Sequence, residues 1–200
     1  ILSVDAETQK IAEKLMEGKR GAVVALDPKT GEVLAMVSAP EYNLADFATV
    51  TTRDVFNKLT TDPDKPLFNR ATASIYSPGS TSKMVGAIAA LEEGVIDENT
   101  TLFCGGGLNY GGRFFKCLHV DGSIKVERAI EHSCNTFFYR LALSLGVDRW
   151  SKYAHKLGFG QKLGLDIGEE MSGICPDRKY YDRAFGKGKW SEGLVINLGI

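Results

Sequence analysis

The sequence predicts a mixed α+β fold in which an antiparallel sheet is flanked by helices. Three observations support it: an amphipathic helical pattern near the start of the chain, two apolar runs spaced as a β-hairpin directly after it, and several helical segments in the second half. The chain has 200 residues, of which 44% are hydrophobic and 24% charged, and this suffices for one core of ordinary size. We therefore expect residues 1–200 to be part of a single domain.

The first predicted elements are an amphipathic helix and a hairpin. The helix ends at Gly18, and Val4, Thr8, Ile11 and Leu15 fall at helical spacing before it. Two apolar runs, 21–26 and 33–37, follow it, and the segment between them begins with Asp27-Pro28. This layout is typical of a hairpin, so we interpret Lys29-Thr30-Gly31 as its turn.

The rest of the chain alternates between loops and helices. Segment 39–66 is polar and interrupted, and we expect loops around a short helix at 52–59 that line the rim of a cleft. Further helices are expected at 80–91, 126–133, 136–145 and 147–157. Segment 173–188 is rich in charge and glycine, and we expect it to be a loop.

A serine and a lysine stand one helical turn apart in the run Ser80-Thr81-Ser82-Lys83. On a helix that begins near Ser80, both side chains lie on one face and can meet, and backbone N–H groups lie beside the hydroxyl. A serine hydroxyl becomes a strong nucleophile when a nearby base removes its proton, and a desolvated lysine can be neutral enough to act as that base. The run therefore indicates acyl-serine chemistry.

This motif has to be weighed against chance, because Ser-x-x-Lys arises about once in a chain of this length. The alternative is a surface helix start, with Ser80 as N-cap and Lys83 as a solvated lysine. Against it, Ser133-Cys134-Asn135 is the only Ser-x-Asn in the chain and follows in the order that acyl-serine enzymes use. The apolar run 84–91 also favours an interior helix.

Four runs together resemble the transpeptidase domain of class B penicillin-binding proteins. They are Phe68-Asn69-Arg70-Ala71, the stretch from Tyr76 to Lys83, the stretch from Ser133 to Tyr139, and 168–173. The Ser-Cys-Asn-Thr-Phe-Phe-Tyr run is the discriminating one, and it points to the cell-elongation type, penicillin-binding protein 2. The resemblance extends from about Leu2 to Ile200, and it implies the penicillin-binding protein and β-lactamase-like transpeptidase fold.

The resemblance implies a role for each residue of the two motifs. Ser80 would attack the carbonyl of the penultimate D-Ala in a D-Ala-D-Ala stem peptide, and Lys83 would take its proton. Ser133 would relay a proton to the departing D-Ala, and Asn135 would hold the substrate amide. An amino group of a neighbouring stem peptide would then resolve the acyl-enzyme and form a cross-link. β-Lactams would enter as mimics of D-Ala-D-Ala, and no cofactor is implied for catalysis.

The family also has a third motif, Lys-[Thr/Ser]-Gly on a strand, which does not occur after Asn135. We expect it beyond Ile200, so that the chain is truncated before the C-terminal strands. Ile1 is not an initiator residue, and we expect a membrane anchor and a pedestal before it. The implied location is the periplasmic face of the bacterial inner membrane. The implied partners, besides peptidoglycan and β-lactams, are a glycosyltransferase and shape-determining membrane proteins.

Two other functions share part of the same pattern. A serine carboxypeptidase or β-lactamase would use Ser80 and Lys83 but needs a base that prepares water for deacylation, and the sequence shows none. A β-lactam sensor or a non-catalytic scaffold would use the acylation as a signal or not at all. The lifetime of the acyl-serine separates these functions.

Three cysteines precede or lie within the second motif, at 104, 117 and 134. A disulfide between Cys104 and Cys117 is one interpretation, since it would close the glycine-rich loop between them. A structural zinc site is the other, because three thiolates and a carboxylate or imidazole satisfy a tetrahedral ion. The five glycines of that loop leave it little other means of ordering.

The fourth ligand of such a site is left open between Asp121 and His119. Elongation-type relatives have Asp, Asp, His and Cys ligands in this stretch, and the resemblance places Asp121-Gly122 where the family has His-Gly. The predicted ligand set is Cys104, Cys117, Asp121 and Cys134, whereas Cys175 is expected to be a small buried hydrophobe.

The remaining features are expected to be structural. His132 and His155 lack a charged partner at fixed spacing, so both are expected to be ordinary surface or half-buried histidines. Trp150, Trp190 and the aromatic run after Asn135 are expected to pack in the core. The net charge of −1 and the absence of a basic run give no support to nucleic-acid binding.

Overall fold

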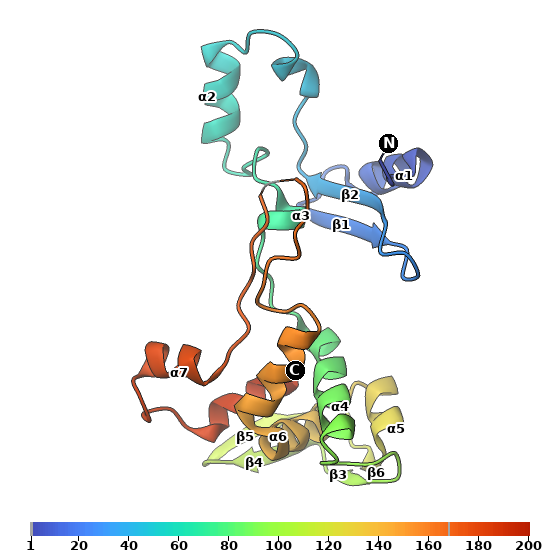
Figure 1. Cartoon of the computed structure of the whole chain (residues 1–200), viewed down its shortest axis with the longest axis vertical. Coiled ribbons are helices and arrows are strands. Elements are labelled where there is room, and N and C mark those ends of the chain that lie inside the picture. Colours follow the sequence, from blue (N-terminus) through green and yellow to red (C-terminus); the bar gives the residue numbers. More distant parts are fainter. Residues whose placement is uncertain (1, 168) are drawn as a thin grey trace. The chain divides into compact units, whose positions relative to one another are not determined.

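The computed structural model describes residues 2–167 and 169–200 (Figure 1). Ile1, and Gly168 at the start of the 168–173 run, lie outside the described residues. The fold consists of two compact units, which are described separately below. The first comprises Ile1–Ile75 and Gly164–Met171, and the second comprises Tyr76–Leu163 and Ser172–Ile200.

The first unit contains the predicted helix and hairpin. Helix α1 (Ala6–Met16) is followed by strands β1 (Gly21–Leu26) and β2 (Val33–Ala39), which pair antiparallel. The turn interpretation of 29–31 is confirmed, because Asp27 N–H donates to the Glu32 carbonyl (2.9 Å) and Gly31 N–H donates to that of Asp27 (2.8 Å). The short elements η1 (Leu44–Phe47), α2 (Arg53–Thr61) and α3 (Arg70–Ala73) complete the unit.

Helix α1 satisfies the outer edge of β2. The Gln9 side chain accepts a hydrogen bond from Met36 N–H (2.8 Å) and donates one to the Met36 carbonyl (3.1 Å). An edge strand carries unpaired backbone N–H and C=O groups, which cost free energy when they are shielded from water. A side chain that binds both groups of one residue removes this cost at that residue. A small core of Ala12, Ala35 and Val37 lies between the helix and the sheet.

The Phe68-Asn69-Arg70-Ala71 run has a structural explanation in this unit. Arg70 is only 4% exposed, and its guanidinium donates to the backbone carbonyls of Asp64, Lys65 (3.1 Å) and Phe68 (3.4 Å). A buried guanidinium needs acceptors for its donors, so the carbonyls of one loop converge on it. Arg70 therefore orders the segment that leads into α3.

The second unit is built around two packed helices. After the turn η2 (Gly79–Ser82), helix α4 (Lys83–Glu92) packs against α6 (Asn135–Lys156), and η3 (Glu192–Gly199) covers α6 (Figure 1). Phe137, Phe138 and Leu141 of α6 are each 1% exposed, which confirms that the aromatic run packs in the core. The remaining elements of this unit are β3 (Leu102–Cys104), β4 (Gly107–Tyr110), β5 (Arg113–Lys116), β6 (Gly122–Ile124), α5 (Val126–Glu131) and α7 (Arg178–Phe185).

The mixed α+β prediction is confirmed, but the sheet differs from the expected one. Within the described residues the strands form three two-stranded antiparallel sheets: β1 with β2, β3 with β6, and β4 with β5. No helix of these residues is both long enough and apolar enough to cross a membrane.

The glycine-rich loop between Cys104 and Cys117 is ordered by its own hairpin, so the argument that it lacks other means of ordering was wrong. Strands β4 and β5 pair from Gly107 with Lys116 to Tyr110 with Arg113. Gly111 (φ 56°) and Gly112 (φ 77°) form the two-residue connection. Positive φ at both central residues is typical of a type I′ turn, which matches the twist of paired strands.

The loop expected at 173–188 was also wrong in part, since it contains helix α7. Asp177 caps this helix by accepting from Tyr180 N–H (2.6 Å). Tyr181 lies on its buried face and packs against Trp190, with ring centroids 5.1 Å apart and ring planes tilted by 33°. The signal was present as an aspartate N-cap followed by aromatic residues four apart, at 181 and 185, but the charge and glycine content outweighed it.

Candidate functional site

Ser80 and Lys83 lie where the second unit's central helix begins. Ser80 is in the 3₁₀ turn η2 and is exposed, whereas Lys83 is the first residue of α4 and only 3% exposed. The Ser82 hydroxyl donates to the Gly79 carbonyl (2.8 Å) and holds the turn. The expected helix start is thus a tight turn that leads into α4.

The Lys83 amino group is fully engaged by the second motif. Its Nζ atom donates to the Ser133 carbonyl oxygen (2.7 Å), the Ser133 Oγ (2.9 Å) and the Asn135 Oδ1 (2.6 Å). An ammonium group has three donors, so these three acceptors saturate it. The two motifs, about fifty residues apart in sequence, therefore form one site.

Ser133 joins Lys83 to Ser80. Its hydroxyl donates to Ser80 Oγ across 2.9 Å while it accepts from Lys83. The Lys83 backbone N–H donates to the Ser80 carbonyl, but within the described residues no hydrogen bond joins the Ser80 hydroxyl to the Lys83 amino group. Hydroxyl groups both donate and accept, so the direction of this chain can reverse once Lys83 is neutral. A proton can then pass from Ser80 through Ser133 to Lys83.

Burial tunes Lys83 for this task. Desolvation lowers the pKa of Lys83 below its ordinary value of 10.5, and the nearby Cys117 and Cys134 sulfurs partly oppose that shift. A lowered pKa increases the neutral fraction near neutral pH, which is the form that accepts a proton.

Ser133 has an uncommon backbone conformation, with φ of +52°. It follows α5 as the residue after the C-cap His132. Ser133 N–H donates to the Ile130 carbonyl (3.0 Å) and Cys134 N–H to that of Ala129 (2.8 Å). This pair of bonds is the Schellman motif, whose left-handed position is usually occupied by glycine. The motif turns the chain sharply, and Ser133 then reaches Ser80 and Lys83.

The next residue, Cys134, belongs to a second cluster. The ligand atoms of Cys104, Cys117, Asp121 and Cys134 all lie within 4.8 Å of one another. The Cys117 and Cys134 sulfurs are 3.8 Å apart, and all four cysteines of the chain are free thiols in this structure. A Cys104–Cys117 disulfide is therefore not formed here, and Cys175 lies outside the cluster.

Asp121 rather than His119 completes the cluster. The Asp121 side chain is 3% exposed, and its Oδ2 is a buried oxygen without a hydrogen-bond partner. The His119 side chain is exposed, and its backbone contacts the cluster: its carbonyl accepts from the Cys104 thiol (3.4 Å). Three sulfurs and one free carboxylate oxygen at this spacing fit a tetrahedral divalent ion.

Two members of the cluster, Asp121 and Cys117, are shifted toward the ionised form that a metal ligand needs, whereas desolvation raises the pKa of Cys134. The nearby thiol of Cys134, and then the hydrogen bond with His132, hold the pKa of Asp121 below its usual value of 3.8. Desolvation opposes ionisation of Cys117, but hydrogen bonds from the His119 and Thr136 backbone outweigh it and lower the Cys117 pKa to about 7. Metal ligands bind as thiolate and carboxylate, so both shifts favour ligation.

Sequence reasoning missed the partner of His132. Its Nδ1 lies 2.9 Å from Asp121 Oδ1, on a residue eleven positions earlier that no helical spacing would connect to it. His155, by contrast, is exposed and pairs with the Phe159 carbonyl at 3.0 Å, as an ordinary surface histidine does.

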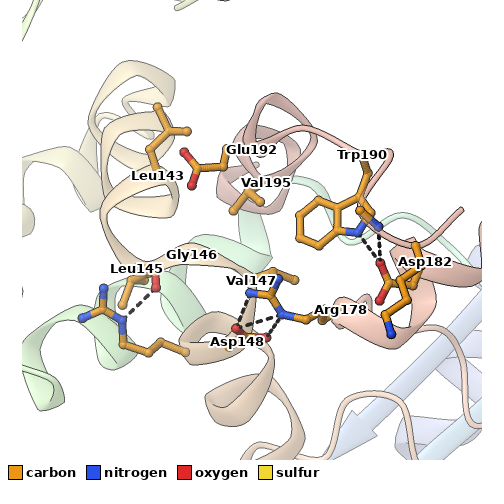
Figure 2. Close-up of a pocket in the computed structure, with 13 residues that line it drawn as sticks. Leu143, Leu145, Gly146, Val147, Asp148, Arg178, Asp182, Trp190, Glu192 and Val195 are labelled. Carbon is orange, nitrogen blue, oxygen red and sulfur yellow. Dashed lines mark hydrogen bonds and ion pairs between the residues drawn. The ribbon is translucent and has the colours of Figure 1, made fainter. Parts of the chain in front are cut away.

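A cavity of the second unit lies elsewhere and involves different residues. It has a volume of about 680 Å³ and borders Gly146, where α6 is interrupted by a non-helical residue, and the loop after α7 (Figure 2). Its polar groups bind one another: Arg178 pairs with Asp148 (2.6 Å), and Trp190 Nε1 donates to Asp182 Oδ1 (2.8 Å). None of the motif residues lines it, so this cavity offers no group for the chemistry above.

Comparisons with known proteins agree with the geometry. Residues 21–200 match the family described as penicillin binding protein transpeptidase domain. Over 205 residues the chain is 40% identical to peptidoglycan D,D-transpeptidase MrdA of Escherichia coli (strain K12), which covers 100% of this chain and 32% of that relative. The chain thus spans about a third of the length of such relatives.

Solved structures give the same result. The structure of Pseudomonas aeruginosa PBP2 in complex with WCK 5153 is 37% identical over 100% of this chain and 46% of that chain, with a TM-score of 0.91. The complex between PBP2 and MreC from Helicobacter pylori contains a chain 35% identical over 98% of this chain and 38% of its own, with a TM-score of 0.90. These likenesses confirm the predicted fold and the resemblance to penicillin-binding protein 2. With matching sequence, matching backbone and the two motifs in one site, the chain belongs to the penicillin-binding protein transpeptidase family.

Proposed function

We propose that this chain carries the acyl-serine site of a peptidoglycan D,D-transpeptidase that acts in cell-wall elongation. The observation that carries the proposal is the Ser133 hydroxyl, which is hydrogen bonded to both Ser80 Oγ (2.9 Å) and Lys83 Nζ (2.9 Å). This arrangement gives an exposed serine a continuous path to a buried amine.

The first half-reaction forms the acyl-enzyme. Ser80 Oγ attacks the carbonyl of the penultimate D-Ala while its proton passes through Ser133 to neutral Lys83. The new C–O bond replaces the C–N bond to the last D-Ala, and the proton returns through Ser133 to the departing amine. Asn135 Oδ1 is already bound by Lys83, so its amide nitrogen is the group that holds the substrate carbonyl.

The second half-reaction exchanges one acyl bond for another. An amino group of a neighbouring stem peptide attacks the ester, Lys83 accepts its proton through the same path, and Ser80 leaves with a proton. No ATP is required, because an amide bond is broken in the first step and formed in the second. A β-lactam takes the first step only, since its opened ring stays attached and no leaving group departs.

The activity of the whole protein is part of the proposal, because the chain covers only 32% of its curated relative. We place both units in one transpeptidase domain, with the third motif, the membrane anchor and the pedestal outside these 200 residues. The site would face peptidoglycan on the periplasmic side of the inner membrane. The complex of Helicobacter pylori PBP2 with MreC supports a shape-determining partner, and a glycosyltransferase is proposed on the family resemblance.

We also propose that the cluster of Cys104, Cys117, Asp121 and Cys134 holds a structural Zn²⁺. The buried, unpartnered Asp121 Oδ2 supports this, because such an oxygen is costly unless something binds it. The ion would supply cross-linking of the chain, and it would take no part in acyl transfer. Catalysis itself would need no cofactor.

The test is covalent labelling with a fluorescent penicillin, followed over time by intact mass. This chain, a longer form that includes a Lys-Thr/Ser-Gly strand, and Ser80→Ala variants of both are compared. Stable labelling that the Ser80 variant loses supports the proposal, and transfer of the acyl group of a D-Ala-D-Ala peptide to an added amine identifies the transpeptidase.

Other outcomes point elsewhere. Rapid loss of the label in plain buffer would identify a hydrolytic relative, that is, a carboxypeptidase or β-lactamase. Stable labelling without transfer to any amine would identify a sensor. Failure of the longer form to label at all would overturn the enzyme and leave a scaffold.

A further inference from the structure

His132 stands at the junction of the two clusters described above. It is the C-cap of α5 and directly precedes Ser133, whose hydroxyl bridges Ser80 and Lys83. Its imidazole contacts the thiol cluster, because Nδ1 is hydrogen bonded to Asp121 Oδ1 at 2.9 Å. One residue therefore touches the carboxylate of the thiol cluster and adjoins the catalytic hydroxyl.

The geometry assigns the two oxygens of Asp121 different tasks. An ionised carboxylate only accepts hydrogen bonds, so the Nδ1 that faces Oδ1 carries the proton. The other oxygen, Oδ2, is buried without a hydrogen-bond partner, and a carboxylate oxygen of Asp121 lies within 4.8 Å of the three sulfurs. By occupying Oδ1, His132 leaves Asp121 a single oxygen for an ion, which suits a four-coordinate site.

The neighbouring backbone is strained and needs support. A non-glycine residue at φ +52° costs about 1 kcal/mol or more and persists only where its surroundings determine it. Ser133 is held on both sides: Cys134 lies in the cluster, and His132 is tied to the same cluster through Asp121. Release of either side would let this turn relax and carry the Ser133 hydroxyl away from Lys83.

We propose that His132 is a positioning residue for acyl transfer. By binding Asp121 Oδ1 it anchors the end of α5 to the thiol cluster of Cys104, Cys117, Asp121 and Cys134, and the anchored turn places Ser133 between Ser80 and Lys83. The proposal rests on the function proposed above and adds a specific link between the cluster and the serine site.

The experiment uses the full-length, metal-loaded protein and compares variants that differ in where residue 132 places its N–H group. Asn at 132 can place an amide N–H near the Nδ1 position, whereas Gln places it near Nε2, so His132→Asn and His132→Gln form a matched pair. His132→Ala removes the bond, and His155→Ala is the control at an exposed histidine outside the site.

Two measurements are made on each variant. The first is the rate of acylation by fluorescent penicillin, separated into initial affinity and chemical step. The second is the rate at which zinc passes to the chromophoric chelator 4-(2-pyridylazo)resorcinol. Loss of an outer partner of a metal ligand typically costs 10–100-fold, so His132→Ala should slow the chemical step and speed zinc release by about 10-fold or more. Initial affinity should change little, and His132→Asn should recover most of both losses.

Several results would overturn the proposal. Equal behaviour of the Asn and Gln variants would show that the Nδ1 contact does not matter, and this comparison decides even if the Ala variant fails to fold. Wild-type acylation and zinc release in His132→Ala would also refute it. If the wild-type protein takes no label, the proposed function fails instead, while zinc release still reports on the Asp121 contact.

Discussion

Ser133 occupies a backbone position that helix ends usually give to glycine. The Schellman bonds at Ile130 and Ala129 fix it there, and the left-handed conformation is unfavourable for any residue with a Cβ. A glycine would relieve the strain but would have no hydroxyl to place between Ser80 and Lys83. Local stability and chemistry therefore conflict at this single residue.

We predict that two substitutions at Ser133 differ in stability but have the same effect on activity. The free energy of unfolding of Ser133→Gly should exceed that of Ser133→Ala by about 1 kcal/mol, because only glycine adopts the left-handed conformation without strain. Both variants should lose penicillin acylation, since both lack the bridging hydroxyl. Urea unfolding and labelling rates measure the two effects, and equal stability of the two variants would contradict the strain argument.

The lowered pKa of Lys83 predicts the pH dependence of acylation. The folded protein releases this proton at lower pH than the unfolded chain, whose lysine has the ordinary value of 10.5. Acylation should therefore rise as pH increases through the lowered pKa. In the window between that pKa and 10.5, the contribution of Lys83 to stability should rise with pH as well, because burial disfavours only the charged form.

Labelling rates between about pH 6 and pH 10 check this prediction. Lys83→Arg is the control, because a guanidinium stays charged throughout and its acylation should be negligible at every pH. A wild-type rate that is flat across the range would argue against Lys83 as the base.

Much of the site could be predicted from sequence, because motif spacing records which residues must meet. Ser80, Lys83, Ser133 and Asn135 were predicted from the two motifs, and the structure brings their side chains together. The bridging position of Ser133 could not be predicted, because it depends on a turn conformation that serine rarely adopts. The His132–Asp121 contact likewise depends on tertiary packing, which no local spacing encodes.

At the scale of elements, α6 is two helices joined at Gly146. Its φ of 70° and ψ of 169° lie in a region that only glycine readily occupies, so the chain breaks there between two helical halves. The second half supplies Trp150 and Tyr153 to the core, and the kink directs them. The kink thus depends on a backbone conformation of Gly146 that other residues do not readily adopt.

We predict that Gly146→Ala destabilises the protein by about 1–3 kcal/mol although nothing lies within 4 Å of the added Cβ. Gly86→Ala is the matched change in a regular part of α4, where the new Cβ meets its nearest neighbours at 3.8–4.0 Å. That variant should be neutral or more stable by about 0.5–1 kcal/mol. Chemical denaturation of both distinguishes backbone strain from steric crowding, and a stable Gly146→Ala protein would show that the kink is not required.

Element prediction succeeded where hydrophobic spacing was regular. Helix α1, the β1–β2 hairpin and the helices on both sides of Ser133 follow from apolar periodicity and turn residues. Strands β4 and β5 were missed because each is only four residues long and glycines flank them, so neither strand shows a clear alternation of apolar and polar residues. Helix α7 was missed because the segment is rich in charge and glycine, which favours a loop. The packing of its Tyr181 against Trp190 is a tertiary contact that the composition does not indicate.

At the scale of the whole molecule, the thiol cluster joins four separate parts of the second unit. Cys104 ends β3, Cys117 follows β5, Asp121 precedes β6, and Cys134 is the N-cap of α6. An ion bound by all four would close the chain between them, and its binding energy would add to the stability of the fold.

Metal removal is therefore expected to destabilise the protein. Dialysis against a strong chelator should lower the thermal midpoint by more than about 5 °C, and zinc should restore it. Elemental analysis of the purified protein should give about one zinc per chain. Cys104→Ser should lose the metal, whereas Cys175→Ser, outside the cluster, should keep it. Identical midpoints with and without chelator would refute a structural ion.

The turn at Ser133 also bears on how such a protein can be evolved in the laboratory. A library selected for heat resistance alone would enrich glycine at position 133, because that change removes strain from the folded state. A library selected for penicillin labelling would retain serine there. The same codon would thus be driven in opposite directions by two common screens, and a thermostable scaffold made for inhibitor discovery has to keep this position fixed.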